Sequence, residues 1–192
     1  MGEMALHADK KMRPARICLF SILCLFLWAG CEDPAGQKTV THENQAHSEK
    51  SSDRIVVHLY FSDSDNAFLV SEERSLLART SPEALGLQIM NALLEGPKQA
   101  LERTIPEGTL LRGFYILKNR TAYVDLSHEI REGHPGGAQS ELMTIYSMVN
   151  SLILNIPEIE TVKILVEGKE ETTLAGHVDL RFPFQANMLL IR

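Results

Sequence analysis

The pattern of apolar positions is clearest between Gly136 and Pro157. Gly136 and Gly137 allow a sharp turn into a helix, and Pro157 prevents its continuation. Between them the apolar residues recur at steps of three and four: Leu142, Ile145, Tyr146, Val149, Leu152, Ile153 and Ile156. This spacing places one broad apolar stripe on a helix. A helix of about 18 residues is about 27 Å long, so the stripe predicts packing against a surface of similar length, such as one face of a sheet.

A second amphipathic helix is predicted near residues 82–95. Ser81 offers a capping hydroxyl, Pro82 suits the first helical position, and Glu83 places an acid in the first turn. Gly96 and Pro97 end the pattern. Its inner stripe consists of Leu85, Ile89, Ala92 and Leu93, widened by Leu87, Met90 and Leu94.

Extended segments are predicted around these helices. They are residues 55–61, 68–77, 110–117, 121–126 and 161–167, with a short one at residues 177–183. The three polar residues between 110–117 and 121–126 indicate a hairpin, and residues 127–135 are predicted to be a polar loop. Two striped helices interleaved with about four strands predict an α+β domain. We expect a mixed or antiparallel sheet covered on one face by the helices near 82–95 and 138–156.

The segment before this domain has the features of a bacterial export signal. A basic stretch begins at Lys10, an apolar run extends from Ile17 to Trp28, and small residues precede Cys31. The run is shorter than the ~20 apolar residues of a transmembrane helix, and small residues before a cysteine mark a processing site. Ala29-Gly30-Cys31 resembles the lipobox of bacterial lipoproteins, although Trp28 stands where that pattern prefers leucine. The resemblance implies a signal peptide over residues 1–31 and lipidation of Cys31; a short uncleaved anchor is the alternative.

Residues 32–53 are predicted to be a flexible tether. They are polar, and Val40 is their only large aliphatic residue, so they cannot bury enough surface to offset their ordering entropy. A coil of this length spans about 25 Å, which would hold the domain clear of lipid headgroups. His42 and His47 lie in this segment without other ligand types around them, which favours a solvated tether over a metal site.

Charge and cysteine content exclude several functions. The 192-residue chain has a formal net charge of -6. Removing residues 1–31 leaves 15 basic and 23 acidic residues, a net charge of -8, which argues against binding nucleic acid. Cys18, Cys24 and Cys31 all lie in the leader. The body therefore has no thiol for a disulfide, a zinc site or nucleophilic catalysis.

The polar residues that could support chemistry are Asp125, His128, His134 and Glu141. Two histidines six apart with nearby acids could in principle hold a metal or perform acid–base catalysis, but the spacing matches no ligand motif. We therefore predict loop histidines, no catalytic residue, no metal site and no cofactor. An envelope metal-dependent hydrolase using His128, His134 and Asp125, and a small-ligand or glycan-binding lipoprotein, are the alternatives.

Other polar residues are predicted to stabilise turns. Asp125 and Ser127, at the end of a predicted strand, are expected to bond the nearby backbone. Asn150, beside the helical stripe, is expected to bond a loop backbone rather than a substrate. Gly136 and Gly137 could bind an anion at a helix start, but the geometry of an entry turn is the favoured interpretation.

A series of short motifs, by their order and spacing, resembles the GerMN domain family. The motifs are Leu59-Tyr60-Phe61, Leu94-Glu95-Gly96-Pro97, Ile105-Pro106-Glu107-Gly108, Ala122-Tyr123-Val124-Asp125-Leu126-Ser127, Gly136-Gly137, Val149-Asn150-Ser151-Leu152 and residues 162–168. Ser151 stands where the family commonly has threonine, and the chain has one domain where the sporulation protein has two. The resemblance implies a GerMN-like domain over residues 54–192, with a fold similar to the ring-building motif of secretion-type assemblies.

The resemblance also implies a function. GerMN domains occur in lipoproteins of sporulation and spore germination and in other envelope lipoproteins. We expect a non-catalytic, membrane-tethered interaction or assembly module outside the cytoplasm, held in the cell membrane or outer membrane by lipid on Cys31. The expected partner is an envelope protein, and an oligomer is left open. Strand edges and the apolar residues 188–191 are the candidate contact surfaces, although the favoured expectation is that this tail packs back onto the domain.

Overall fold

The computed structural model describes residues 53–79 and 81–192. The predicted signal peptide with Cys31, and the predicted tether except for Asp53, lie outside the described residues. The elements in chain order are β1 (Arg54–Ser62), β2 (Leu69–Leu77), α1 (Pro82–Glu95), β3 (Leu111–Ile116), β4 (Thr121–Leu126), α2 (Glu129–Glu132), α3 (Ala138–Ile153), β5 (Thr161–Val166) and the 3-10 helix η1 (Met188–Leu190).

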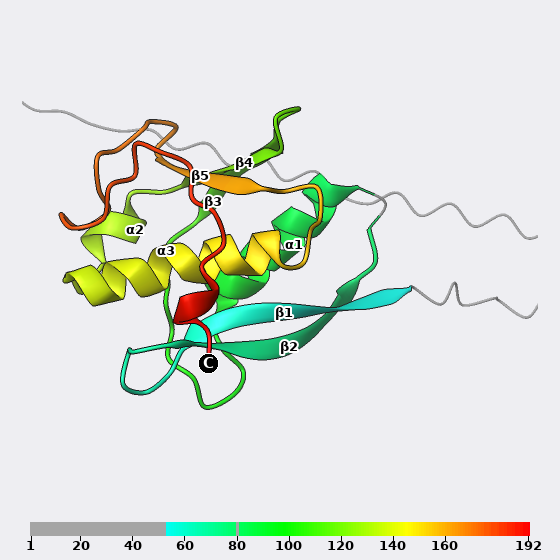
Figure 1. The fold of residues 1–192 in the computed structure, drawn as a ribbon, viewed down its shortest axis with the longest axis horizontal. Helices are drawn as coiled ribbons and strands as arrows, with labels where there is room; N and C mark the ends of the chain where they lie inside the picture. The colour runs from blue at the N-terminus through cyan, green and yellow to red at the C-terminus, as the bar shows by residue number, and fades with distance from the viewer. Residues whose placement is uncertain (1–52, 80) are drawn as a thin grey trace, which may run out of the picture. The chain divides into compact units, whose positions relative to one another are not determined.

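The strands form two sheets with the long helices between them (Figure 1). β1 and β2 make an antiparallel hairpin. The second sheet has the order β3-β4-β5; β3 and β4 are antiparallel, and β4 and β5 are parallel. The predicted α+β class and the mixed sheet are confirmed. The expectation of a single sheet is corrected, because β1 and β2 form a separate sheet on the other side of α1 and α3.

β1 stays apart from the larger sheet because side chains of α3 and of the turn after it occupy its outer edge. The Asn155 side chain accepts a bond from His58 N (2.9 Å) and donates one to His58 O (2.7 Å). One turn earlier, Ser151 Oγ accepts from Tyr60 N (3.0 Å), and Ser147 Oγ donates to Tyr60 O (2.6 Å). These bonds replace the strand that would otherwise pair with β1.

α3 follows the predicted helix but is buried on more than its apolar stripe. Gly136 and Gly137 have φ of 80° and 87°, which confirms the predicted entry turn, and the helix ends at Ile153, three residues before Ile156. In the stripe, Ile145, Val149, Leu152 and Ile156 are buried, and the other three residues are partly buried. Five polar residues of α3 are buried as well: Glu141, Thr144, Ser147, Asn150 and Ser151. A helix between two sheets has no solvent face along most of its length, so its polar side chains must find partners inside the protein.

Two smaller expectations differ from the structure. The predicted loop at residues 127–135 contains the one-turn helix α2, which is too short for a helical period to reveal. Residues 177–183 form no strand. Asp179 accepts a bond from Arg181 N (2.9 Å), and Leu180 N bonds Thr172 O (2.8 Å), so this segment bends instead of extending.

α1 has both predicted ends. The Ser81 side chain accepts a bond from Ala84 N (3.2 Å), and Gly96 ends the helix with φ of 90°. Ile89 and Leu93 are fully buried, in the core that α1 shares with both sheets. Gly86 faces β3, where an added Cβ would overlap the ring of Phe114. The missing side chain therefore allows α1 to approach the sheet closely.

Gly86→Ala is expected to destabilise the protein, although the same change in an exposed helix stabilises it by about 1 kcal/mol. The overlap with the buried Phe114 ring should cost more than the helix gains, with a net loss of about 1–2 kcal/mol. Urea denaturation measures this change. As the matched control, Phe114→Leu should lower the free energy of unfolding by less in the Gly86→Ala variant than in the wild type. A more stable Gly86→Ala variant would show that this contact is loose.

Candidate functional site

The candidate residues of the polar set lie in two places, Asp125 and His128 beside the turn after β5 and His134 and Glu141 at the start of α3, and each has its own structural role. Glu141 is fully buried in the first turn of α3. Its carboxylate accepts backbone bonds from Leu174 (2.8 Å), Ala175 (2.9 Å) and His177 (2.9 Å), and His177 Nδ1 lies 3.4 Å away. Burial alone would raise the pKa of Glu141, but these backbone donors outweigh it and the pKa is lowered. Glu141 is thus an ionised anchor for the loop at residues 172–178.

His134 closes the turn into α3. Its Nδ1 accepts a bond from Gly136 N (3.0 Å), so the neutral ring has its proton on Nε2, which lies 3.1 Å from Thr144 Oγ1. Burial lowers the pKa of His134, which favours this neutral form. Both ring nitrogens are therefore engaged, and neither is directed at a substrate.

His128 lies at the start of α2 among three carboxylates. Its Nε2 is 3.5 Å from Glu129 and 3.4 Å from Glu132, and its Nδ1 is 3.8 Å from Glu167. Within residues 53–79 and 81–192, His128 and His134 have no partner in common. In the described part of the chain no three His, Cys, Asp or Glu side chains are arranged to hold a metal ion. An adjacent hollow of about 500 Å³ is lined by side chains of both charges, and Arg131 there pairs with Glu171 (3.0 Å).

Asn150 forms the predicted bonds to a loop backbone, whereas Asp125 and Ser127 bond the backbone of distant segments instead of their own turn. Asp125 accepts a bond from Gly168 N (2.7 Å), just after β5, and lies 3.4 Å from Arg112 Nε. Ser127 Oγ accepts from Leu110 N (2.9 Å). The Asn150 amide bonds Asn187 twice, donating to its carbonyl (3.1 Å) and accepting from its N–H (2.9 Å). These residues connect loops to the core.

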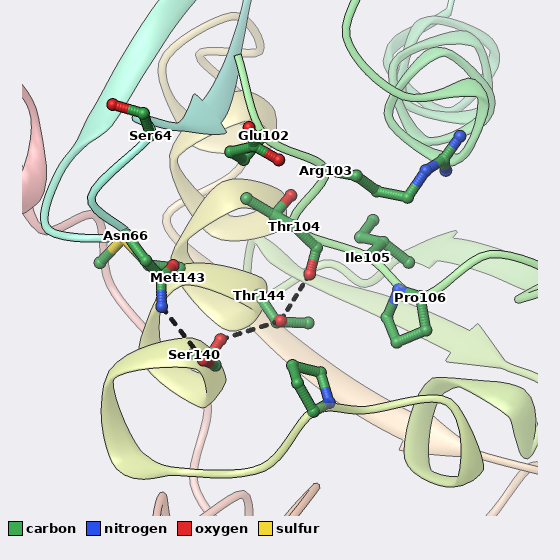
Figure 2. Close-up of a pocket in the computed structure, with 11 residues that line it drawn as sticks. Ser64, Asn66, Glu102, Arg103, Thr104, Ile105, Pro106, Ser140, Met143 and Thr144 are labelled. Atoms are coloured by element: carbon green, nitrogen blue, oxygen red, sulfur yellow. Dashed lines mark hydrogen bonds between the residues drawn. The ribbon is translucent and has the colours of Figure 1, made fainter.

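Figure 2 shows a cavity of about 320 Å³ beside the first half of α3. Several of its polar groups bond one another. Asn66 Nδ2 donates to Ser140 Oγ (3.1 Å), and Thr144 Oγ1 donates to the carbonyl of Thr104 (2.5 Å). Arg103 points away from the cavity and binds carbonyls at the end of α1. Among the described residues, the side chains of Ser64 and Glu102, which also line the cavity, form no hydrogen bond.

The C-terminal tail folds back onto the domain, as the favoured expectation held. Arg192 N bonds Leu69 O (3.0 Å), and Ile191 packs with its neighbour Leu190 on a small cluster of Tyr60, Leu69 and Met143. η1 nevertheless leaves Met188 58% and Leu189 87% exposed. The tail is therefore both a packed element and an apolar protrusion.

Three other large apolar residues are exposed on or beside β3. Leu110 is 63%, Tyr115 57% and Leu117 48% exposed. Tyr115 and Leu117 are two residues apart, so their side chains leave the same face of the sheet. Phe114, which precedes Tyr115 and faces the other side of the sheet, is buried against α1. None of the described helices is long and apolar enough to cross a membrane.

The fold and these contacts describe a small α+β domain whose conspicuous polar residues stabilise its own loops. The family model described as "Germane: Sporulation and spore germination" matches residues 58–172, which is more than half of the chain. The chain therefore belongs to the Germane family. The GerMN resemblance found in the sequence is confirmed, and the matched residues lie inside the predicted domain at residues 54–192.

Solved structures with the same fold agree. The tandem GerMN domains of the sporulation protein GerM from Bacillus subtilis have 20% identity and a TM-score of 0.57, covering 69% of this chain and 46% of that one. The first GerMN domain of the same protein has 19% identity and a TM-score of 0.53, covering 69% of this chain and 98% of that one. This chain thus spans about half of the tandem structure.

A structure described as a candidate lipoprotein from Clostridium perfringens has 29% identity and a TM-score of 0.49. The match covers 69% of this chain and 87% of that one. No curated protein sequence matches this chain.

Proposed function

We propose that this Germane-family protein is a lipid-anchored, non-catalytic interaction module of the cell envelope, working with a protein partner in sporulation or germination. The main observation that supports this proposal is that its polar residues are engaged within the domain while several large apolar residues are exposed. Glu141, His134 and Asp125 are engaged by the domain itself, whereas large apolar side chains on η1 and along β3 remain exposed. Grouped exposed apolar residues are typical of protein contact sites.

The alternatives are less well supported. A hydrolase using His128, His134 and Asp125 requires these side chains to converge on one reacting atom. His128 and Asp125 contact the adjacent residues Glu167 and Gly168 after β5. His134 instead contacts Thr144 in α3, so the three side chains do not converge. For a glycan-binding protein, the cavity in Figure 2 has no aromatic side chain in its lining on which a sugar could stack.

The anchor part of the proposal rests on the lipobox-like sequence before Cys31. Cells grown with labelled palmitate should incorporate label into this protein, and Cys31→Ser should abolish the incorporation, because no thiol remains at the processing site. Cys24→Ser is the matched control and should keep the label. Label retained in Cys31→Ser would disprove lipidation at this position.

The interaction part is tested by site-specific photo-crosslinking in intact cells. A photoreactive residue at Leu189 or Leu117 should capture an envelope protein, because both side chains are exposed and apolar. The same residue at Ser71, which is exposed on the polar outer edge of β2, is the control. Replacing single residues is preferable to deleting the C-terminal tail, because the deletion would also remove Asn187 and its bonds to Asn150.

Cells should be examined during growth, sporulation and germination. Capture from an apolar position and not from Ser71 supports an interaction function. If no envelope protein is captured from any exposed position in any of these conditions, the interaction function is wrong.

A further inference from the structure

We propose that the free edge of β3 is a docking site for an extended segment of another protein, which adds to the three-stranded sheet as a fourth strand. The inference rests on the proposed interaction function and specifies its surface and the chemistry of its partner. It follows from comparing the outer edges of the four edge strands in the two sheets: β1, β2, β3 and β5.

From His58 to Ser62 the edge of β1 is closed by the chain itself, as is the edge of β5, whereas Ile55 and Val56 at the start of β1 are exposed. Side chains of Ser147, Ser151 and Asn155 bond the outer backbone of β1. The outer edge of β5 is covered by the chain after it: Val162 and Phe184 exchange two backbone bonds of 2.8 Å each. Neither strand can accept another strand there without losing these bonds.

β2 discourages pairing in a different way. Its ends are engaged, since Arg192 N bonds Leu69 O (3.0 Å) and the Gln88 side chain bonds Leu77 O (3.0 Å). Between them the exposed side chains are Ser71, Glu73 and Ser75. Polar and charged side chains on an edge are typical of strands that avoid partners.

After its start, where a β-bulge and the exposed Arg112 lie, the edge of β3 has neither kind of protection. Leu117 N bonds Thr121 O (3.0 Å) where the hairpin closes. Because bonding directions alternate along a strand, the backbone groups of Phe114 and Ile116 point away from β4. Within residues 53–79 and 81–192 no hydrogen bond from another segment reaches these groups. They form the spaced donors and acceptors that an extended chain requires.

The side chains around this edge indicate what the partner presents. Tyr115 and Leu117 stand exposed on the outer face of the sheet, and Leu110 lies just before the strand. Tyr123 is opposite Tyr115 on β4 and is half-buried. An added strand would place every second side chain next to Tyr115 and Leu117, so the partner segment should be apolar at alternate positions.

Charge distinguishes a different protein from a second copy of this chain. Residues 110–120 contain three basic residues and no acid, although the body of the protein is acidic overall. Arg112 pairs with Asp125 and Glu167, and Arg120 pairs with Glu160. Lys118 is exposed and has no ion pair in the described part of the chain. A second β3 would bring the same basic residues, whereas a partner segment with an acid near Lys118 is complementary.

The test uses the full chain purified in detergent and a synthetic seven-residue peptide that alternates valine and threonine and ends in glutamate. The peptide should bind saturably and slow amide hydrogen exchange at Phe114 and Ile116. A control peptide N-methylated at alternate residues lacks the required donors and should not bind. Replacing the terminal glutamate with lysine should weaken binding.

Protein variants provide the matched comparison. Combined Tyr115→Lys and Leu117→Lys should weaken peptide binding roughly tenfold, because two cross-strand contacts are lost. Ser71→Lys on the β2 edge should leave binding unchanged. The double lysine variant and the Ser71→Lys variant should both keep the wild-type melting temperature, because all the altered side chains are exposed.

Equal binding of the N-methylated peptide, protection at β2 instead of β3, or no binding would overturn the proposal. So would a wild-type dimer that the lysine variant abolishes, since a second copy would then occupy the edge. If the peptide fails to bind while Leu189 captures a partner in cells, only the docking site is wrong. If the peptide binds but no partner is captured in cells, the interaction function itself is wrong.

Discussion

Replacing Glu141 with alanine is expected to lower the free energy of unfolding by about 3 kcal/mol, because the loop at residues 172–178 loses its anchor. The carboxylate is fully buried and accepts three backbone N–H groups. Without it these donors lose charged partners, and each unpaired buried donor costs about 1–3 kcal/mol. We expect the total loss of unfolding free energy to lie near the lower end of the range for three such donors. The reason is that the His177 side chain is half-exposed, so water can reach this region.

The matched control is Glu83→Ala. Glu83 also lies in the first turn of its helix, but it is exposed. Interaction with the helix dipole alone is worth about 0.3–1 kcal/mol, so Glu83→Ala should cost no more than this. Urea denaturation of both variants separates the two contributions. Equal losses in the two variants would mean that Glu141 acts only through the helix dipole.

The effect of Glu141 should depend on pH in a defined direction. Its pKa in the folded protein is below the ordinary value of 4.5. Its contribution is therefore complete above about pH 4.5 and is lost as the pH falls through the folded pKa. The stability difference between the wild type and Glu141→Ala should narrow in this acidic range. A difference that stays constant below pH 4.5 would contradict the lowered pKa.

Leu152→Ala is expected to cost about 2–5 kcal/mol of unfolding free energy, the range for truncating a buried leucine. Leu152 is fully buried in the core that α3 shares with both sheets. Because α3 lies between the sheets, little of the surrounding structure can move into the space that alanine leaves. Val149, one turn earlier and equally buried, should also be sensitive to replacement with alanine.

Leu154 provides the comparison for Leu152. It lies two residues further along, at the C-cap of α3, and is 41% exposed. Leu154→Ala should change the unfolding free energy by less than about 0.5 kcal/mol, as is usual for surface positions. A loss under about 0.5 kcal/mol for Leu152→Ala would place that side chain at the surface and contradict the packing of α3.

The sequence alone determined the elements whose signals are local. The helix stripes, the Ser81 cap, the glycine turn at Gly136 and the hairpin after β3 each depend on residues within a few positions of one another. Local periodicity and capping chemistry are enough to predict such elements. That Asn150 bonds a loop backbone was likewise predicted, whereas Asp125 and Ser127 bond segments 43 and 17 positions away and not their own turn.

Only the tertiary structure decided how these elements are used. Glu141 bonds residues 33 to 36 positions later in the chain, and Ser151 closes the edge of a strand 91 residues earlier. The steps of four between Ser147, Ser151 and Asn155 could have indicated a polar stripe, but not the strand that it meets. Which strand edges are covered, and that the edge of β3 stays open beside exposed apolar side chains, depends on contacts between distant segments. Sequence patterns report the period of one segment and not the identity of its neighbour, so these features required the fold.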